Sequence, residues 1–154
     1  MKRFAAFWIV VVTLLAIAAP HAGAQTQTQT PPALLDANTA TDAQLAAVPN
    51  LNAALVKAIV GKRPFKSVTE LDALLMPTLN RMQITEVYGR VFVPVNLNSG
   101  TDAEILLIPG VGNRMLREFK EYRPYTAIEQ FRREIGKYVT KEEVARMERY
   151  VVIK

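Results

Sequence analysis

NLNSGTDAEILLIPGVGNRM, residues 96–115, contains two short helical patterns joined by a tight turn. Thr101 followed three residues later by Glu104 is a capping box, in which side chain and backbone satisfy each other's free groups at a helix N-terminus. The turn PGVG at residues 109–112 comes next, and its glycines permit positive φ and a close approach of another backbone. The stretch therefore predicts a helix, a tight turn and a second helix that begins near Asn113.

The same pattern occurs sixty residues earlier in the chain. Residues 36–94 align with residues 96–154 without a gap, and the identical pairs include Asn38/Asn98, Thr41/Thr101, Asp42/Asp102, Ala43/Ala103, Pro49/Pro109, Arg63/Arg123 and Pro64/Pro124. Apolar positions coincide more widely, at Leu45/Ile105, Val48/Ile108, Leu55/Met115, Ile59/Phe119, Val68/Ile128, Leu71/Phe131, Leu75/Ile135, Ile84/Val144 and Val91/Val151. A duplication explains this shared register best.

Capping boxes mark the other helix starts in each copy. They are Thr41 with Gln44, Ser67 with Glu70, and Asn80 with Gln83 in the first copy, and Thr101 with Glu104, Thr126 with Glu129, and Thr140 with Glu143 in the second. Together with the helix after each turn, they predict four short helices per copy. Each copy ends in a β-leaning tail, at residues 91–93 or 151–153, which either pairs with its counterpart or packs on the helices.

The predicted fold is all-α, with two tandem four-helix units at residues 35–94 and 95–154. A unit of about 60 residues is small for an independent core. Only Pro94 and Val95 separate the two copies, which leaves little free linker. We therefore expect both units to pack as one compact body.

The N-terminal residues predict an exported protein. Lys2 and Arg3 precede an apolar stretch from Phe4 to Ala19, and Ala22-Gly23-Ala24 resembles a cleavage site, so residues 1–24 are predicted to be a secretory signal peptide. The alternative is a retained membrane anchor, for which about 16 apolar residues are short. Residues 25–34 are polar, end in paired prolines before Ala33, and predict a short extended spacer. The expected location is periplasmic or extracellular.

Composition argues against an enzyme. The chain has no cysteine, and its one histidine, His21, lies in the predicted signal peptide. Thiol nucleophiles, histidine-assisted serine chemistry and the usual zinc ligand sets are therefore missing from the exported part. The net charge of +5 falls to +3 when Lys2 and Arg3 are removed with the signal peptide. This mild basic bias permits binding to a polyanion without requiring it, and we expect no cofactor, metal or small-molecule substrate.

The turn at residues 109–112 is the best candidate for a binding site. Backbone amides of residues 110–113 are expected to point outward at a helix N-terminus, where partial positive charge favours an anion such as phosphate. Apolar Val111 is expected to dock the turn on the core.

This stretch resembles the helix-hairpin-helix motif of exported competence proteins of the ComEA type, which bind double-stranded DNA during uptake. The resemblance covers residues 35–65 and 95–125. It implies that each four-helix unit is built on such a motif, and that Gly110, Val111, Gly112, Asn113 and Arg114 grip the DNA backbone without reading bases.

Basic residues after the turn extend this candidate site. Arg114, Arg117, Lys120 and Arg123 recur at three-residue spacing, which predicts a basic stripe to which Arg114, Arg117 and Lys120 contribute DNA contacts. The alternative is that Arg114 pairs with Glu118 and Arg117 with Glu121, four residues apart, which would give a neutralised solvated face.

The first copy departs from the motif because Asn50 and Asn52 occupy the two glycine positions. Asparagine tolerates left-handed conformations, so the turn is expected to survive, but the added Cβ atoms would crowd a phosphate. This copy offers a secondary basic patch instead, made of Lys57, Lys62, Arg63 and Lys66.

Two functions remain open from the sequence. The first is sequence-independent binding of duplex DNA through the second hairpin, with a role in DNA uptake as one use. The alternative is a module for protein–protein interaction or assembly in the cell envelope, with no nucleic-acid activity. The degenerate first hairpin and the acids among the basic residues after the second favour this alternative.

Overall fold

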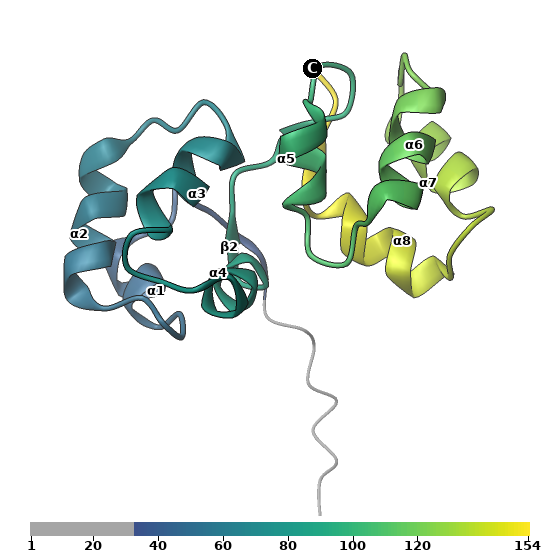
Figure 1. The fold of residues 1–154 in the computed structure, drawn as a ribbon. Coiled ribbons are helices and arrows are strands. Elements are labelled where there is room, and N and C mark those ends of the chain that lie inside the picture. The colour runs from purple at the N-terminus through teal and green to yellow at the C-terminus, as the bar shows by residue number, and fades with distance from the viewer. Residues whose placement is uncertain (1–32) are drawn as a thin grey trace, which may run out of the picture. The chain divides into compact units, whose positions relative to one another are not determined.

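A computed structural model describes residues 33–154, and this part of the chain is mostly α-helical (Figure 1). The predicted signal peptide, residues 1–24, and residues 25–32 of the predicted spacer lie outside the described residues. In chain order the elements are β1 (Leu35–Asp36), α1 (Asp42–Ala46), α2 (Ala53–Lys62), α3 (Val68–Leu75), α4 (Arg81–Tyr88), β2 (Val91–Phe92), β3 (Val95–Asn96), α5 (Asp102–Leu106), α6 (Asn113–Glu121), α7 (Ile128–Ile135), α8 (Lys141–Glu148) and β4 (Val151–Val152).

The order of elements repeats along the described residues. A strand, four helices and a second strand make up the first half, residues 35–94, and the same series makes up the second half, residues 95–154. Four helices in each half agree with the sequence prediction. The prediction of an all-α fold needs a correction, because each half also holds two short strands.

The β-leaning tails pair with the beginning of their own half. Strand β2 runs parallel to β1, with Val91 opposite Leu35, and β4 runs parallel to β3, with Val151 opposite Val95. Each pair ties the first residues of a half to its last ones. Pairing of one tail with the other, one of the two alternatives left open by the sequence, does not occur among the described residues.

Three of the predicted capping boxes form in full, at Thr41, Asn80 and Thr101. In each of them the cap side chain accepts a backbone N–H, and the Gln or Glu three residues later accepts the N–H of the cap residue. These boxes fix the starts of α1, α4 and α5.

The other three boxes differ from the prediction. Ser67 precedes α3 but makes no side-chain cap bond. Thr140 caps α8 at 3.3 Å from the Glu143 nitrogen, but the Glu143 carboxylate accepts from Arg146 instead of closing the box. The box at Thr126 with Glu129 is wrong. Helix α7 begins after Ala127, and Gln130 Oε1 accepts the Thr126 N–H at 3.1 Å, as the Glu70 carboxylate accepts the Lys66 N–H at 3.1 Å in the first half.

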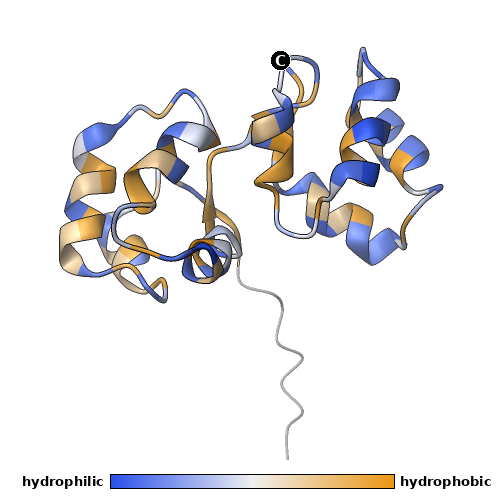
Figure 2. Cartoon of the chain, in the orientation of Figure 1, coloured by the Kyte–Doolittle hydropathy of each residue, from blue (hydrophilic) through white to orange (hydrophobic). Residues whose placement is uncertain are grey.

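Residues 33–154 belong to one compact unit with a buried apolar core. The buried residues of the helices are mostly hydrophobic, and each helix also carries hydrophilic residues (Figure 2). The halves meet in the core, where the Phe92 and Tyr150 rings pack edge to face with centroids 4.9 Å apart. The aromatic residues after Arg-Pro in the two halves, Phe65 and Tyr125, are also buried.

Residues identical in both halves brace the ends of α2 and α6. The Asn98 side chain donates to the Tyr125 carbonyl at 2.9 Å and accepts its N–H at 2.7 Å, and Asn38 makes the same two bonds with Phe65. Nε and Nη2 of Arg123 donate to the carbonyls of Leu97 and Gly100 at 2.6 and 2.7 Å. These bonds hold the segment before each helix pair against the segment after it.

Candidate functional site

The predicted turn between α5 and α6 spans residues 107–112, and we call it the glycine turn. Gly110 adopts a φ of 80°, in the left-handed region that disfavours residues with a Cβ. Val111 is buried, and its N–H donates to the Ile108 carbonyl at 3.0 Å. The expectation that Val111 docks the turn is therefore confirmed, but its amide is engaged inside the turn and is no free donor.

The N-terminus of α6 carries no side-chain cap. Gly112 occupies the cap position with an ordinary extended φ of −108°, and the first hydrogen bond of the helix runs from the Leu116 N–H to its carbonyl. The amides of the first turn, from Asn113 to Met115, thus have no acceptor within the helix. A Cβ added to Gly112 would meet no atom within 4 Å, so the space beside the cap position is open.

The equivalent turn in the first half, residues 47–52, is the asparagine turn. Asn50 adopts a φ of 69°, as expected for a residue that tolerates this region. Asn52 caps α2, because its side chain accepts the Leu55 N–H at 2.9 Å. The Asn50 side chain donates to Glu86 of α4 at 2.7 Å. The helix N-terminus is therefore capped, and a carboxylate lies beside its turn.

Arg146 of α8 lies beside the glycine turn and was missed by the sequence analysis. A Cβ on Gly110 would come within 2.8 Å of Arg146 Nη2, so the guanidinium group lies against the backbone of this turn. Glu143 accepts from Nε and Nη2 of Arg146 at 2.8 and 2.6 Å, and this pairing raises the pKa of the arginine and lowers that of the glutamate. The residue sixty positions earlier is Glu86, but Glu143 Oε1 also lies 3.7 Å from the Cβ position of Gly110, so an arginine–glutamate pair lies beside this turn in place of a single carboxylate.

The basic residues of α6 do not form the predicted pairs along the helix. Within residues 33–154, neither Arg114 nor Arg117 makes an ion pair with the glutamate four residues on. The Arg114 guanidinium lies 5.8 Å from the centre of the Tyr138 ring. Lys120 instead pairs with Asp102 of α5 at 2.6 Å. Arg114 and Arg117 are exposed at the first two turns of α6, whereas the charge of Lys120 is matched by a partner.

The secondary basic patch is divided by the fold. Lys57, Lys62 and Lys66 are exposed on and after α2. Arg63 turns inward, where its Nε and Nη2 donate to the carbonyls of Ala37 and Ala40 at 2.6 and 2.7 Å. Arg63 is therefore a bracing residue of the first half, as Arg123 is of the second.

The described residues contain no group of three acids or histidines that could hold a metal ion. No helix within residues 33–154 is long and apolar enough to cross a membrane. Compared with known protein families, curated proteins and solved structures, the chain shows no match.

Proposed function

We propose that this chain is an exported protein that binds double-stranded DNA regardless of its sequence, and that its halves are tandem helix-hairpin-helix units. The glycine turn is the binding hairpin and the asparagine turn is a scaffold. One observation carries this proposal: the N-terminus of α6 has no side-chain cap, and the space beside its cap residue, Gly112, is open.

Such a helix end suits a DNA phosphate. Free amides and the positive end of the helix dipole favour an anion at this position. Arg114 and Arg117 lie exposed in the first two turns of α6, and Arg146 lies beside the turn. Contacts of this kind go to the DNA backbone, so they fix the position of the duplex and carry no sequence information.

The first half supplies an internal comparison. Its asparagine turn has the same path, but Asn52 uses the amide that a phosphate would need, and Glu86 places negative charge beside the turn. The side-chain cap is missing at the glycine turn, and Arg146, paired with Glu143, stands there in place of Glu86, so two features that bear on anion binding differ between turns of similar backbone. This concerted difference favours a binding role for the glycine turn over a role as a connector alone.

Replacing Gly112 by aspartate tests the proposal. The backbone of Gly112 is extended and the space around it is open, so aspartate fits and can cap α6 as Asn52 caps α2. Its carboxylate would occupy the place of the phosphate. We expect Gly112→Asp to weaken duplex binding at least about tenfold while leaving helix content and thermal stability unchanged or higher. Fluorescence anisotropy in a salt series, with two unrelated duplex sequences, measures this.

Asn52→Asp is the matched control, because it adds the same charge at the equivalent cap of the first half. This variant is expected to bind like the parent. Parent affinity should fall steeply with salt and be equal for both duplexes. A parent chain that does not bind duplex at low salt, or a Gly112→Asp variant that binds normally, would refute the proposal.

A further inference from the structure

Two tyrosines of the second half are joined through their hydroxyl groups, and we call them the tyrosine pair. Tyr122 directly follows α6 and Tyr138 lies after α7, and their hydroxyl oxygens are 2.8 Å apart, so one donates a hydrogen bond to the other. Both rings are partly buried and pack against the apolar core. The Tyr138 N–H also donates to the Ile135 carbonyl at 3.0 Å. The Tyr138 ring is therefore held both by its hydroxyl group and by its backbone.

The Glu118 side chain of α6 lies beside the tyrosine pair. Its Oε2 atom is buried and has no hydrogen-bond partner within residues 33–154. The pKa of Tyr138 is raised above its ordinary value of 10, first by the hydrogen bond with Tyr122 and then by the Glu118 carboxylate. Residues 114, 118 and 122 follow one another at four-residue spacing, so they lie on one face of α6. This face of α6 therefore meets Tyr138.

Arg114 is the third residue of this face, and its guanidinium group lies over the Tyr138 ring, 5.8 Å from the centre. Attraction between a guanidinium group and an aromatic ring orders the long side chain without neutralising its charge. Within residues 33–154, Arg114 makes no ion pair and donates no hydrogen bond. Lys120 and Arg146, by contrast, are paired with acids. The N–H groups of Arg114 therefore remain available to an external acceptor.

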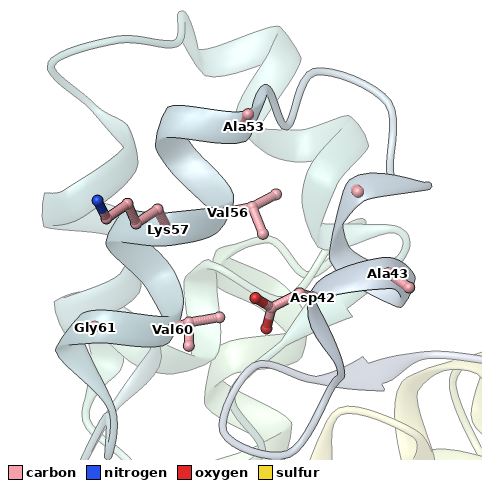
Figure 3. A pocket seen from close by; sticks show the side chains of 8 residues that line it. Asp42, Ala43, Ala53, Val56, Lys57, Val60 and Gly61 are labelled. Carbon is pink, nitrogen blue, oxygen red and sulfur yellow. The ribbon is translucent and has the colours of Figure 1, made fainter.

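The first half lacks this arrangement at all four positions. The residues that stand there in place of Arg114, Glu118, Tyr122 and Tyr138 are Ala54, Ala58, Lys62 and Thr78. Figure 3 shows Lys57 of α2, the equivalent of Arg117, extending away from the other labelled side chains. The arrangement thus occurs in the half whose helix end is open, and is missing from the half whose helix end is capped by Asn52.

We infer that Tyr138 is a positioning residue of the duplex site, which holds Arg114 in place for a DNA phosphate, and this inference rests on the proposed function. Arg114 is the second residue of α6, so it leaves the helix in the turn whose amides have no acceptor within the helix. An arginine that is already ordered loses less conformational freedom on binding, and its planar group can donate two parallel hydrogen bonds to one phosphate. Tyr122 and Glu118 act through the Tyr138 ring, and Arg114 makes the contact with DNA.

A double-mutant cycle of duplex affinity, measured on the full chain, tests this inference. Arg114→Ala should weaken binding about tenfold, and Tyr138→Leu should weaken it about fivefold while Arg114 is present. In the Arg114→Ala chain, Tyr138→Leu should weaken binding by less than about twofold further, because the residue through which it acts is gone. Effects of Arg114→Ala and Tyr138→Leu that simply add would overturn the inference.

Arg117→Ala is the matched control for this cycle. It removes the same charge from the same helix, but from an arginine that has no contact with the Tyr138 ring. The effects of Arg117→Ala and Tyr138→Leu on duplex affinity should therefore add. Equal coupling of Tyr138 to both arginines would show that the ring supports the fold of α6 as a whole, and would overturn its role in positioning Arg114.

NMR relaxation of the arginine Nε–H groups gives a measurement that needs no DNA. In the free parent chain, the Nε–H of Arg114 should have a higher order parameter than that of Arg117, and Tyr138→Leu should abolish this difference. An Arg114 as mobile as Arg117 in the parent would overturn the inference even if the duplex binds. A parent chain with an ordered Arg114 that binds no duplex would instead refute the proposed function.

Lysine at the two arginine positions tests the inference even if Tyr138→Leu does not fold, because both side chains are exposed. Arg114→Lys should weaken duplex binding about fivefold, since lysine keeps the charge but lacks the planar group that stacks and donates in parallel. Arg117→Lys should change the affinity by less than about twofold, because charge alone is expected to matter there. Equal effects of the two lysine variants would overturn the inference.

Discussion

At the scale of single residues, the two glycines of the glycine turn have different roles. The backbone conformation at position 110 requires glycine, because φ is 80° there. A Cβ at this position would also lie only 2.8 Å from Arg146 Nη2. Gly112 has a φ of −108°, which any residue can adopt, and open space around it. Because Gly112 has no side chain, the N-terminus of α6 stays uncapped. The turn itself does not require glycine at this position.

This difference predicts opposite effects of alanine at the two positions. Gly110→Ala should lower the free energy of unfolding by about 1–2 kcal/mol, because alanine is strained at positive φ and Arg146 must move. Gly112→Ala should change it by less than about 1 kcal/mol, in the stabilising direction, because the unfolded chain loses freedom. Urea denaturation followed by circular dichroism measures both values. Equal destabilisation by both changes would show that the turn needs glycine at each position.

Part of the candidate site could be predicted from the sequence, because some of its features depend only on neighbouring residues. The docking of Val111 and the left-handed conformation of Asn50 follow from residue type and turn position alone, and both are found. Arg146 could not be found in this way, because it reaches the glycine turn from α8 through tertiary packing. The reversal from Glu86 to Arg146 in the sixty-residue register was the available signal.

At the scale of helices and strands, the repeat predicts helix starts better than the cap motif alone does. Ser67 and Ala127 lie sixty residues apart and precede α3 and α7, whereas Thr126 lies one residue early in this register. The bond from a backbone N–H to the side chain four residues on occurs in both halves, from Lys66 to Glu70 and from Thr126 to Gln130, and both helices begin two residues after the donor. Strand partners were not predictable, because two-residue tails carry too little pattern to define a register.

Hydrogen bonds join α3 to α4 in the first half and α7 to α8 in the second, with donor and acceptor exchanged between the halves. In the first half, buried Asp72 of α3 accepts from Arg81 at 2.7 Å and from the Tyr88 hydroxyl at 2.8 Å. In the second half, Arg132 stands at the position of Asp72 and donates twice to Glu148 of α8, at 2.7 and 2.5 Å. The contact between helices is kept while donor and acceptor exchange places.

The Arg132–Glu148 pair predicts a loss of stability in acid. Arg132 hydrogen-bonds the Glu148 carboxylate and holds its pKa below the ordinary value of 4.5. The pair therefore stabilises the fold at pH values above 4.5, and this contribution disappears as pH falls through the lowered pKa. Glu148→Gln should lower the urea midpoint at neutral pH and flatten its decline in acid. Glu121→Gln, at an exposed position, is the control. Identical pH profiles for the parent and Glu148→Gln would contradict this role.

At the scale of the whole molecule, duplication has produced halves with one backbone plan and different surfaces. Residues shared by both halves, such as Asn38 with Asn98 and Arg63 with Arg123, make internal bonds. Residues that differ lie at the turns, as Asn52 and Gly112 do, and also between helices, as Asp72 and Arg132 do. The mostly helical fold and its repeated order were therefore predictable from shared positions. The properties of each surface depend on which side chains meet across helices, which a linear pattern does not contain.

This division of roles predicts that the binding turn can be transferred to the first half. The triple variant Asn50→Gly, Asn52→Gly and Glu86→Arg removes the cap of α2, opens the turn and reverses the charge beside it. If these three features suffice for phosphate binding, a titration with short duplex should show two duplexes bound per chain in place of one. The affinity of each of the two sites should fall with salt according to the number of phosphate contacts that the site itself makes.

The single variant Glu86→Arg is the control, because it reverses the same charge while Asn52 still caps α2. It should raise affinity slightly through net charge without adding a second bound duplex. A triple variant that binds only one duplex, like the parent, would mean that the open helix end and its neighbouring cation are insufficient. The second half would then bind through features that the shared backbone does not provide. Two duplexes bound by Glu86→Arg alone would assign binding to charge and would leave the glycines with a role in the turn only.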